Sequence, residues 1–360
     1  MSISRIDGPV RVVGTGLLGT SIALVLRKHG VEVTLVDISP TAVKLAVEYG
    51  AGNPGSNADN PQLIVVAVPP DVVAETVSSE LAAFPKAIVT DVASVKSNIF
   101  NQLLANGAEL TRYVGSHPMA GRERGGAVSA RADLFTGRTW VVCQQDSTDS
   151  GALRMVSDLA TECGAVVVNM TASEHDSAVA LVSHVPQVIS SAVAASLIGA
   201  PEDSVGLAGG GLRDVTRVAA SDPNLWVQIL GANAAEVSPI LRGIKDRIAE
   251  LIDALESGVA TAKVASLLTA GNEGVSRIPG KHGRSAHFTS ILVVIDDRPG
   301  QLAKLLTDIG ELGVNMEDLK LEHSPGSAVG FADVSVLPNE EARLVRELEA
   351  RGWRIAGEAS

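Results

Sequence analysis

The amino-acid sequence predicts an α/β protein: a Rossmann-type doubly wound parallel sheet, then an all-helical domain and a small C-terminal domain of ferredoxin-like order. Three observations indicate this fold class. Short apolar strands alternate with helical patterns along the first half, the middle is helical throughout, and the last part follows the order βαββαβ. With 46% hydrophobic and 19% charged residues among 360, the chain can bury the cores of two or three domains.

A glycine-rich turn follows the first predicted strand, residues 10–13. The turn reads Gly14-Thr15-Gly16-Leu17-Leu18-Gly19, a G-x-G-x-x-G sequence that opens a helix ending at Gly30. Gly14 permits the tight turn, Gly16 lets the backbone approach a pyrophosphate, and Gly19 allows close packing of helix and strand. The helix N-terminus, at Leu17 and Leu18, offers free N–H groups to the phosphates. We therefore expect a dinucleotide cofactor.

The second strand, residues 31–36, ends at Asp37, which lies 23 positions after Gly14. An acid at about this spacing hydrogen-bonds the adenine ribose hydroxyls. A 2′-phosphate would be repelled there, and no arginine follows directly, so NAD is expected rather than NADP.

The alternation of strands and helices continues beyond Asp37. A second helix starts at Ser39-Pro40, and further strands are predicted at 63–68, 87–90, 139–143 and 165–170. Ligands bind at the carboxyl ends of strands in such sheets. This places Gly14, Pro69, Asp91 and the loop after Val114 around one crevice.

Two segments at this crevice carry reactive side chains. They are residues 91–96, with Asp91, Ser94 and Lys96, and residues 115–121, with His117. A histidine at a strand end can serve as a general base near neutral pH, but spacing alone leaves a structural role for His117 equally open.

Several separated motifs occur in a fixed order. They are Asp91-x-x-Ser94-x-Lys96, Ser116-His117-Pro118-Met119-Ala120-Gly121, Ser183-His184-Val185-Pro186, and Gly209-Gly210-Gly211-Leu212-Arg213-Asp214-Val215-Thr216-Arg217 with Ser221 to Trp226. Together with the dinucleotide fold they resemble the prephenate dehydrogenase family of tyrosine biosynthesis over most of residues 8–270. The resemblance implies NAD-dependent oxidative decarboxylation of prephenate to 4-hydroxyphenylpyruvate.

The resemblance also implies roles for single residues. His117 would hydrogen-bond the ring hydroxyl of prephenate and accept its proton as hydride leaves, and Ser94 would orient the same hydroxyl. Arg217 would bind the ring carboxylate through its planar guanidinium. The remaining substrate-binding positions are His184, Gly210 and Arg213.

These roles have structural alternatives. His184 lies on the apolar stretch 178–200, where a histidine can simply be a satisfied core residue. Arg217 could form a surface ion pair with Asp214 on a helix. Pro186 should kink its helix by removing the hydrogen bond to Val182. We interpret the whole stretch as a buried helix at a domain or subunit interface rather than a membrane span. His175-Asp176 is interpreted as a helix start.

The sequence leaves two substrates open, prephenate and arogenate. Many members of the family carry Thr-Glu after the His-Pro-x-Ala-Gly sequence, and here Arg122-Glu123 stands. Arg122 could add positive potential for a dianion, or could signal arogenate as substrate. A β-hydroxyacid dehydrogenase or imine reductase is disfavoured by Ser116-His117-Pro118. A non-catalytic sensor of NAD and an amino acid is disfavoured by the pairing of His117 with Ser94.

The chain is predicted to divide into an NAD-binding domain, 1–172, a helical dimerisation and substrate domain, 173–270, a linker, 271–287, and a C-terminal domain, 288–360. In the family that the sequence resembles, this helical region forms the dimer and completes each active site, so a homodimer is the simplest expectation. The C-terminal domain, with Asp-x-Pro-Gly-x-Leu and Gly-Val-Asn, resembles an amino-acid-sensing ACT domain. The resemblance implies a regulatory site marked by Asp297, Pro299, Gly300 and Asn315 for tyrosine or phenylalanine. A domain used only for dimerisation is the alternative.

The composition and charge of the chain argue against several classes of binding partner. The net charge of −12 argues against nucleic acid or an anionic membrane as the main partner. Cys143 and Cys163 form neither a disulfide framework nor a zinc signature, so no metal is expected. The N-terminal residues lack the apolar stretch of a signal peptide, which favours the cytoplasm.

Overall fold

The computed structural model describes residues 5–122, 125–145, 147–257, 260–278, 288–323 and 329–356. The chain divides into two compact units: one comprises 1–200 and 215–245, and the other comprises 201–214 and 246–360. The helical segment 173–270 therefore contributes to both units.

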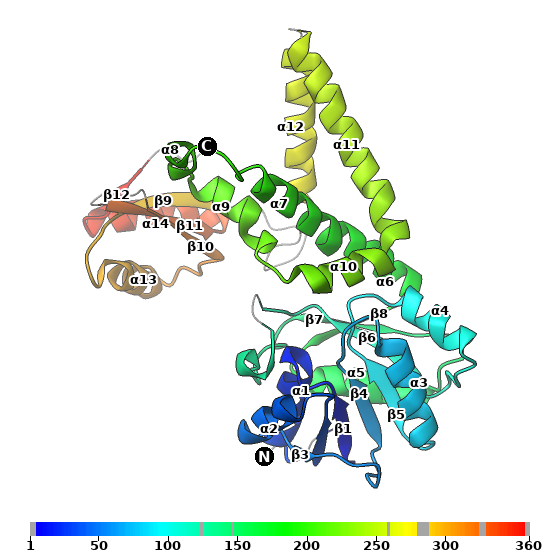
Figure 1. Cartoon of the computed structure of the whole chain (residues 1–360). Coiled ribbons are helices and arrows are strands. Elements are labelled where there is room, and N and C mark those ends of the chain that lie inside the picture. Colours follow the sequence, from blue (N-terminus) through cyan, green and yellow to red (C-terminus); the bar gives the residue numbers. More distant parts are fainter. Residues whose placement is uncertain are drawn as a thin grey trace. The chain divides into compact units, whose positions relative to one another are not determined.

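The first unit contains an eight-stranded sheet of order β3-β2-β1-β4-β5-β6-β7-β8 (Figure 1). The strands are β1 Val10–Val13, β2 Val33–Val36, β3 Asn53–Pro54, β4 Leu63–Val66, β5 Ile88–Asp91, β6 Tyr113–Pro118, β7 Thr139–Cys143 and β8 Val166–Met170. The predicted strands all form, with bounds that differ by one or two residues at their ends.

The sheet is mixed, which corrects the expectation of a wholly parallel sheet. Strands β1 to β6 are parallel, but β7 pairs with β6 in antiparallel register, with His117 opposite Val141. A parallel return needs a crossover of a dozen or more residues, usually a helix. The described part of the 119–138 connection contains a 3₁₀ turn, Ala127–Ser129, and no α-helix, so the chain returns antiparallel.

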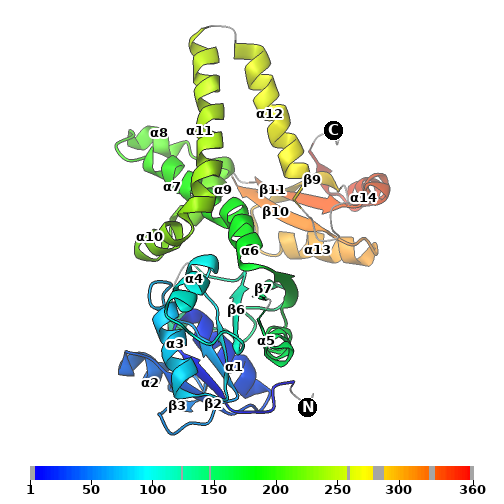
Figure 2. The same ribbon diagram turned by 90° about the vertical axis from the view of Figure 1, so that its right-hand side faces the viewer.

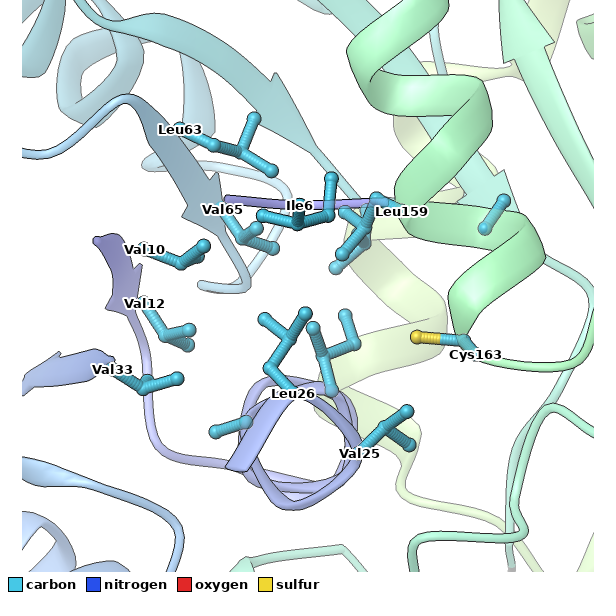
Figure 3. Packing of buried hydrophobic residues seen from close by; sticks show 14 of the residues in the cluster. Ile6, Val10, Val12, Val25, Leu26, Val33, Leu63, Val65, Leu159 and Cys163 are labelled. Atoms are coloured by element: carbon cyan, nitrogen blue, oxygen red, sulfur yellow. The ribbon is translucent and has the colours of Figure 1, made fainter. Parts of the chain in front are cut away.

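Helices cover both faces of this sheet. They are α1 Leu17–Lys28, α2 Pro40–Glu48, α3 Val73–Ala83, α4 Ser97–Ala105 and α5 Ser150–Glu162. Figure 3 shows one core, in which Val12 and Val65 of the sheet lie with Leu26 of α1 and Leu159 of α5. The opposite core packs α3 and α4 against the alternate strand residues, among them Ile64. Each fully buried aliphatic side chain stabilises the fold by roughly 1.5–3 kcal/mol.

A long interrupted helix follows the sheet within the first unit. It consists of α6 Ala172–Val179, a π turn over Ala180–His184, and α7 Val185–Ala195. Thr171 and Glu174 form a capping box that fixes its start. Pro186 cannot donate to Val182, and the expected distortion takes the form of the π turn.

The stretch Ala172–Ala195 has the length and hydropathy of a membrane-crossing helix, and a third of its most apolar 18-residue window is buried. Its polar residues His175, Asp176 and His184 are buried and hydrogen-bonded to protein groups. Such satisfied polar groups are those of a helix packed against protein. Leu181 and Val182 remain exposed on its other side.

Further helices complete both units. In the first are a 3₁₀ turn Arg217–Ala219, α10 Pro223–Ala232 and the first half of α11 Ala234–Glu256. In the second are α8 Glu202–Gly206, most of α9 Gly210–Thr216, the end of α11, and α12 Ala260–Ser276. The predicted linker is partly wrong, because α12 continues through Gly271 and Gly274. The alanine- and leucine-rich turns before them have high helix propensity, and 279–287 lies outside the described residues.

The C-terminal part of the second unit is a four-stranded antiparallel sheet of order β10-β11-β9-β12 (Figure 2). Its elements are β9 Thr289–Asp296, α13 Gln301–Glu311, β10 Asp318–His323, β11 Val329–Val336, α14 Pro338–Ala350 and β12 Arg354–Ile355. Leu305 and Leu344 bring both helices onto one face of the sheet, against Val293 and Val334. The element order is the predicted βαββαβ.

Candidate active site

The glycine-rich turn joins β1 to α1 with geometry that two of its glycines require. Gly14 has φ +99°, and a Cβ there would lie 2.4 Å from the carbonyl oxygen of Ala67. A Cβ on Gly19 would lie 2.0 Å from the oxygen of Gly14. Gly16 caps α1, and a Cβ there would meet no atom within 4 Å. The open side of Gly16, beside the free N–H groups of Leu17 and Leu18, fits a bound pyrophosphate.

Asp37 lies half-buried after β2 and ties two loops together. Its Oδ2 accepts from the backbone N and Oγ1 of Thr15 at 2.7 and 3.0 Å, and its Oδ1 accepts from Ser39 N at 2.9 Å. An ionised carboxylate has about four acceptor positions, so one remains for a ribose hydroxyl. A pocket lined by Asp37, Pro40, Val43, Lys44 and Gly55 adjoins it. These residues fit the adenosine half of NAD. Pro69 is exposed just beyond β4.

His117 lies within strand β6 and not on a loop, which corrects the sequence-based expectation. The strand extends three residues beyond the point where it pairs with Asp91 of β5. The alternation of strand side chains points Ser116 inward, where its Oγ donates to the Asp91 carbonyl at 2.9 Å and lies 3.0 Å from Thr90 Oγ1. His117 then projects to the other face and is half-buried.

A second histidine contacts His117. Nδ1 of His117 lies 2.8 Å from Nε2 of His175 on α6, and the two rings meet edge to face with centroids 5.1 Å apart. Nδ1 of His175 lies 2.8 Å from Oδ1 of Asp176. His175 and Asp176 are both buried. A line of three titratable side chains therefore runs inward from His117.

Asp176 is held by the start of helix α4. Its Oδ1 accepts from Lys96 N at 2.9 Å and its Oδ2 from Ser97 N at 2.7 Å. Burial alone would raise the pKa of Asp176, but the hydrogen bonds from His175, Ser97 and Lys96 outweigh it and lower that pKa below its usual value. Asp176 is therefore an anion at neutral pH.

The pKa of His117 is lowered well below its usual value. Burial is the main cause, and His175, Lys96 and His184 lower the pKa further. His117 is therefore neutral at pH 7 and has a nitrogen lone pair available for a proton.

A buried ion pair, Lys96–Asp91, lies close enough to His117 to act on it electrostatically. The ammonium of Lys96 contacts Oδ1 of Asp91, and Tyr113 Oη donates to Oδ2 of Asp91 at 2.6 Å. Burial and the neighbouring Asp91 raise the pKa of Tyr113 well above its usual value, so it stays a phenol. The pair joins β5, α4 and β6 and places one buried cation near His117.

His184, in the π turn, is buried and hydrogen-bonded to Asn233. Asn233 Nδ2 donates to the backbone oxygen of Asp176 at 2.9 Å and also lies 3.1 Å from His184 Nδ1. Since the Asp176 carbonyl can only accept, the amide nitrogen must face both groups, and Nδ1 of His184 must accept. The proton of neutral His184 then sits on Nε2. Burial lowers the pKa of His184 to about 4. The rings of Trp226 and His184 meet edge to face, with their centroids 5.9 Å apart.

The other predicted positions are less closely tied to this cluster. Ser94 is half-buried in the turn before α4 and makes no hydrogen bond to His117. Arg217 is exposed in its 3₁₀ turn, which packs against α7, and it forms no ion pair with Asp214. Gly210 and Arg213, on α9, belong to the second unit. Arg122 is exposed and donates to the backbone oxygen of Ser129.

Two stretches of the sequence match the two domains of one family. Residues 22–169 match "Prephenate dehydrogenase, nucleotide-binding domain", and residues 171–268 match "Prephenate dehydrogenase, dimerization domain". Among curated relatives, "Probable prephenate dehydrogenase NovF" of Streptomyces niveus is 35% identical over 354 residues, 95% of this chain and 98% of its own. This chain belongs to the prephenate dehydrogenase family.

Other members of the prephenate dehydrogenase family extend the likeness. "Prephenate dehydrogenase" of Bacillus subtilis is 24% identical over 97% of this chain and 98% of its own. The structure of Aquifex aeolicus prephenate dehydrogenase with hydroxyphenyl propionate and NAD⁺ has a TM-score of 0.68 at 28% identity, covering 76% of this chain and 99% of its own. The structure of Synechocystis arogenate dehydrogenase has a TM-score of 0.63 at 25% identity, and the match covers 75% of this chain and 100% of its own. The chain is an NAD-dependent oxidoreductase.

Sequence reasoning missed three residues of the site in this family member. In the sequence, His175 and Asp176 indicate only a helix start, and no pattern marks Asn233. Each contacts a partner about fifty or more residues away in sequence. The capping box at Thr171 and Glu174 places His175 and Asp176 in the first turns of α6, but no local pattern identifies the partners of these side chains.

Proposed function

We propose that this chain oxidises prephenate with NAD and releases carbon dioxide and 4-hydroxyphenylpyruvate. The observation that carries the proposal is a neutral histidine, His117, on the same sheet as the glycine-rich turn and at the carboxyl end of the parallel strands. Family membership and the NovF and Aquifex relatives support the same substrate.

The glycine-rich turn, residues 14–19, and Asp37 would hold NAD, which would supply the acceptor for the hydride of C4 of the substrate. Nε2 of His117 takes the proton of the C4 hydroxyl as that hydride leaves, so C4 becomes a carbonyl carbon. Loss of the ring carboxylate as carbon dioxide leaves its electron pair in the ring, which becomes aromatic, and the phenolate oxygen recovers the proton. A positioned base of this kind contributes about 10²–10⁴-fold in rate.

Other residues would hold the substrate. Arg217, exposed and without an ion-pair partner among the described residues, would bind the ring carboxylate through two parallel N–H bonds. His184 would donate a hydrogen bond from Nε2 to the substrate, and Ser94 would orient the C4 hydroxyl. Gly210 and Arg213 remain predicted contacts.

A spectrophotometric assay of NADH formation tests the proposed function. Prephenate and arogenate are compared, each with NAD and with NADP. We expect the highest kcat/KM with prephenate and NAD. Higher kcat/KM with arogenate would assign the chain to arogenate oxidation, and no NADH from either substrate would contradict the proposal.

A homodimer would account for the exposed apolar residues on the interrupted helix. Leu181 and Val182 are 59% and 65% exposed, and the segment belongs to the region matched as a dimerization domain. Sedimentation should give a dimer for the wild-type chain and a shift towards monomer for Val182→Glu. A monomeric wild type would contradict this proposal.

The C-terminal domain would bind tyrosine or, second, phenylalanine as a regulator. Its βαββαβ order supports an ACT-like domain, and Gly300 has φ +89° where α13 begins. Asp297, Pro299 and Gly300 precede α13 and Asn315 follows it. The eleven residues of that helix span roughly 16 Å, so one copy does not bring the two ends together.

A site that used both ends of α13 would therefore take them from two copies of the domain. Calorimetry on the intact protein should detect tyrosine binding, and Gly300→Val should weaken it, because valine disfavours a positive φ. Absence of heat with both tyrosine and phenylalanine would contradict the regulatory proposal.

A further inference from the structure

The inward line from His117 contains two residues that touch no expected substrate atom. His175 is 0% exposed and Asp176 is 2% exposed. Their side chains hydrogen-bond to one another, to His117, and to the backbone at the start of α4. Buried side chains in such a line have few possible arrangements of protons, and the arrangement decides what His117 can do.

The end of the line at Asp176 is fixed. The backbone N–H groups of Lys96 and Ser97 can only donate, and they do so to Oδ1 and Oδ2 of Asp176 at 2.9 and 2.7 Å. The carboxylate therefore accepts from every neighbour. Nδ1 of His175, 2.8 Å from Oδ1, must carry a proton.

The proton on Nδ1 determines the other side of the His175 ring. A neutral His175 presents a lone pair at Nε2, which lies 2.8 Å from Nδ1 of His117. Two lone pairs do not face each other at this distance, so Nδ1 of His117 must donate. The Nε2 of His117 is then unprotonated.

The opposite arrangement would require a charged His175. The charged His175 would donate from its Nε2 to Nδ1 of His117. Neutral His117 would then carry its own proton on Nε2, and that nitrogen could not act as a base. A fully buried imidazolium is costly, and Asp176 already receives two backbone donors that compensate its charge. The geometry favours the neutral chain.

We infer that His175 and Asp176 are positioning residues for His117, which they hold as the Nδ1–H tautomer with its Nε2 lone pair free. The inference rests on the proposed function, in which His117 is the base. When Nε2 takes the substrate proton, the new cation donates to His175, whose own N–H points at a carboxylate. Both the tautomer and the cation are thereby stabilised. A catalytic imidazole locked in the wrong tautomer lowers kcat by about 10⁴-fold, and one that is left free to adopt either tautomer loses less.

The first test is spectroscopic and needs no substrate. Long-range ¹H–¹⁵N correlation on the wild-type protein, with His117 assigned by comparison with His117→Asn, reports which ring nitrogen carries the proton. We expect Nδ1–H in the wild type and a shift towards Nε2–H in His175→Leu. A wild-type His117 protonated on Nε2 would overturn the inference.

The second test is kinetic and uses a matched set. His175→Leu removes the acceptor, and we expect kcat with prephenate to fall 10²–10³-fold while both KM values change less than threefold. His175→Gln can accept from His117 through its amide oxygen and should retain at least a tenth of wild-type kcat. Glu174→Gln removes a carboxylate from the same turn and should change kcat less than twofold.

The outcomes distinguish a failure of the positioning inference from a failure of the proposed function. Equal kcat in His175→Leu and wild type would overturn the inference, as would a loss in His175→Gln as large as that in His175→Leu. If the leucine variant fails to fold, the glutamine variant and the wild-type spectrum still decide the question. A wild-type chain that forms no NADH from prephenate contradicts the proposed function, whereas the spectrum still determines the tautomer.

Discussion

The amide Nδ2 of Asn233 lies 3.1 Å from Nδ1 of His184 and donates to it. Because the same nitrogen also donates to the Asp176 carbonyl, Asn233 connects the π turn to the helix that carries His175. Two histidines of the site are thus held in opposite tautomers: His184 protonated on Nε2, and His117, by our inference, on Nδ1.

Replacement of Asn233 by aspartate should change the charge of His184. A carboxylate beside Nδ1 favours the imidazolium, so the pKa of His184 should rise from about 4. Titration of the imidazole carbon-bound protons by NMR measures this pKa. Asn224→Asp, at an exposed position on α10, is the control and should leave the pKa of His184 unchanged. An unaltered pKa in Asn233→Asp would contradict the assigned hydrogen bond.

Acid should destabilise the fold through His184. The unfolded chain protonates this histidine near pH 6.5 and the folded chain near pH 4, so neutral His184 contributes stability above pH 6.5 that is lost as the pH falls to 4. The loss is on the order of 3 kcal/mol. Urea unfolding at pH 7.5 and 4.5 measures it against His184→Gln. Parallel pH dependence in both proteins would exclude His184 as the cause.

Arg217 should matter for substrate binding more than for turnover. Loss of a bidentate ion pair with a carboxylate should raise the KM for prephenate at least tenfold in Arg217→Ala and leave the KM for NAD within threefold. Arg242→Ala, an exposed arginine on α11, is the charge-matched control. A normal KM for prephenate would remove Arg217 from the carboxylate site.

Discrimination between NAD and NADP should depend on Asp37. In Asp37→Ser the carboxylate that repels a 2′-phosphate is gone, and Lys44 lines the same pocket. The ratio of kcat/KM for NAD to that for NADP should fall at least tenfold, about 1.4 kcal/mol. Lys44→Gln added to this variant should restore part of the ratio. An unchanged ratio would show that another residue sets the preference.

Much of the fold could be predicted because its signals are local. Apolar strands such as residues 63–66, the Ser39-Pro40 helix start, and the positive φ at Gly30 and Gly14 each depend on neighbouring residues. The direction of β7 could not be predicted this way, because it depends on whether 119–138 forms a crossover helix.

The same distinction between local and distant signals applies to the residues of the site. His117 and the glycine-rich turn have motifs, whereas His175 and Asp176 act through contacts with residues 58 and 80 positions away. Asn233 likewise follows an ordinary helix end and reaches His184 across 49 positions. Contacts of this kind arise from packing between elements, which a single sequence does not encode in any short pattern.

The pH dependence of kcat with prephenate and NAD tests the central claim most directly. In the wild type, kcat should be constant at neutral pH and fall tenfold per pH unit below the lowered pKa of His117. His117→Asn should lose 10²–10⁴-fold in kcat at pH 7.5 and show no such fall. If His117→Asn keeps wild-type kcat and the same acid limb, His117 is not the base and the account is wrong.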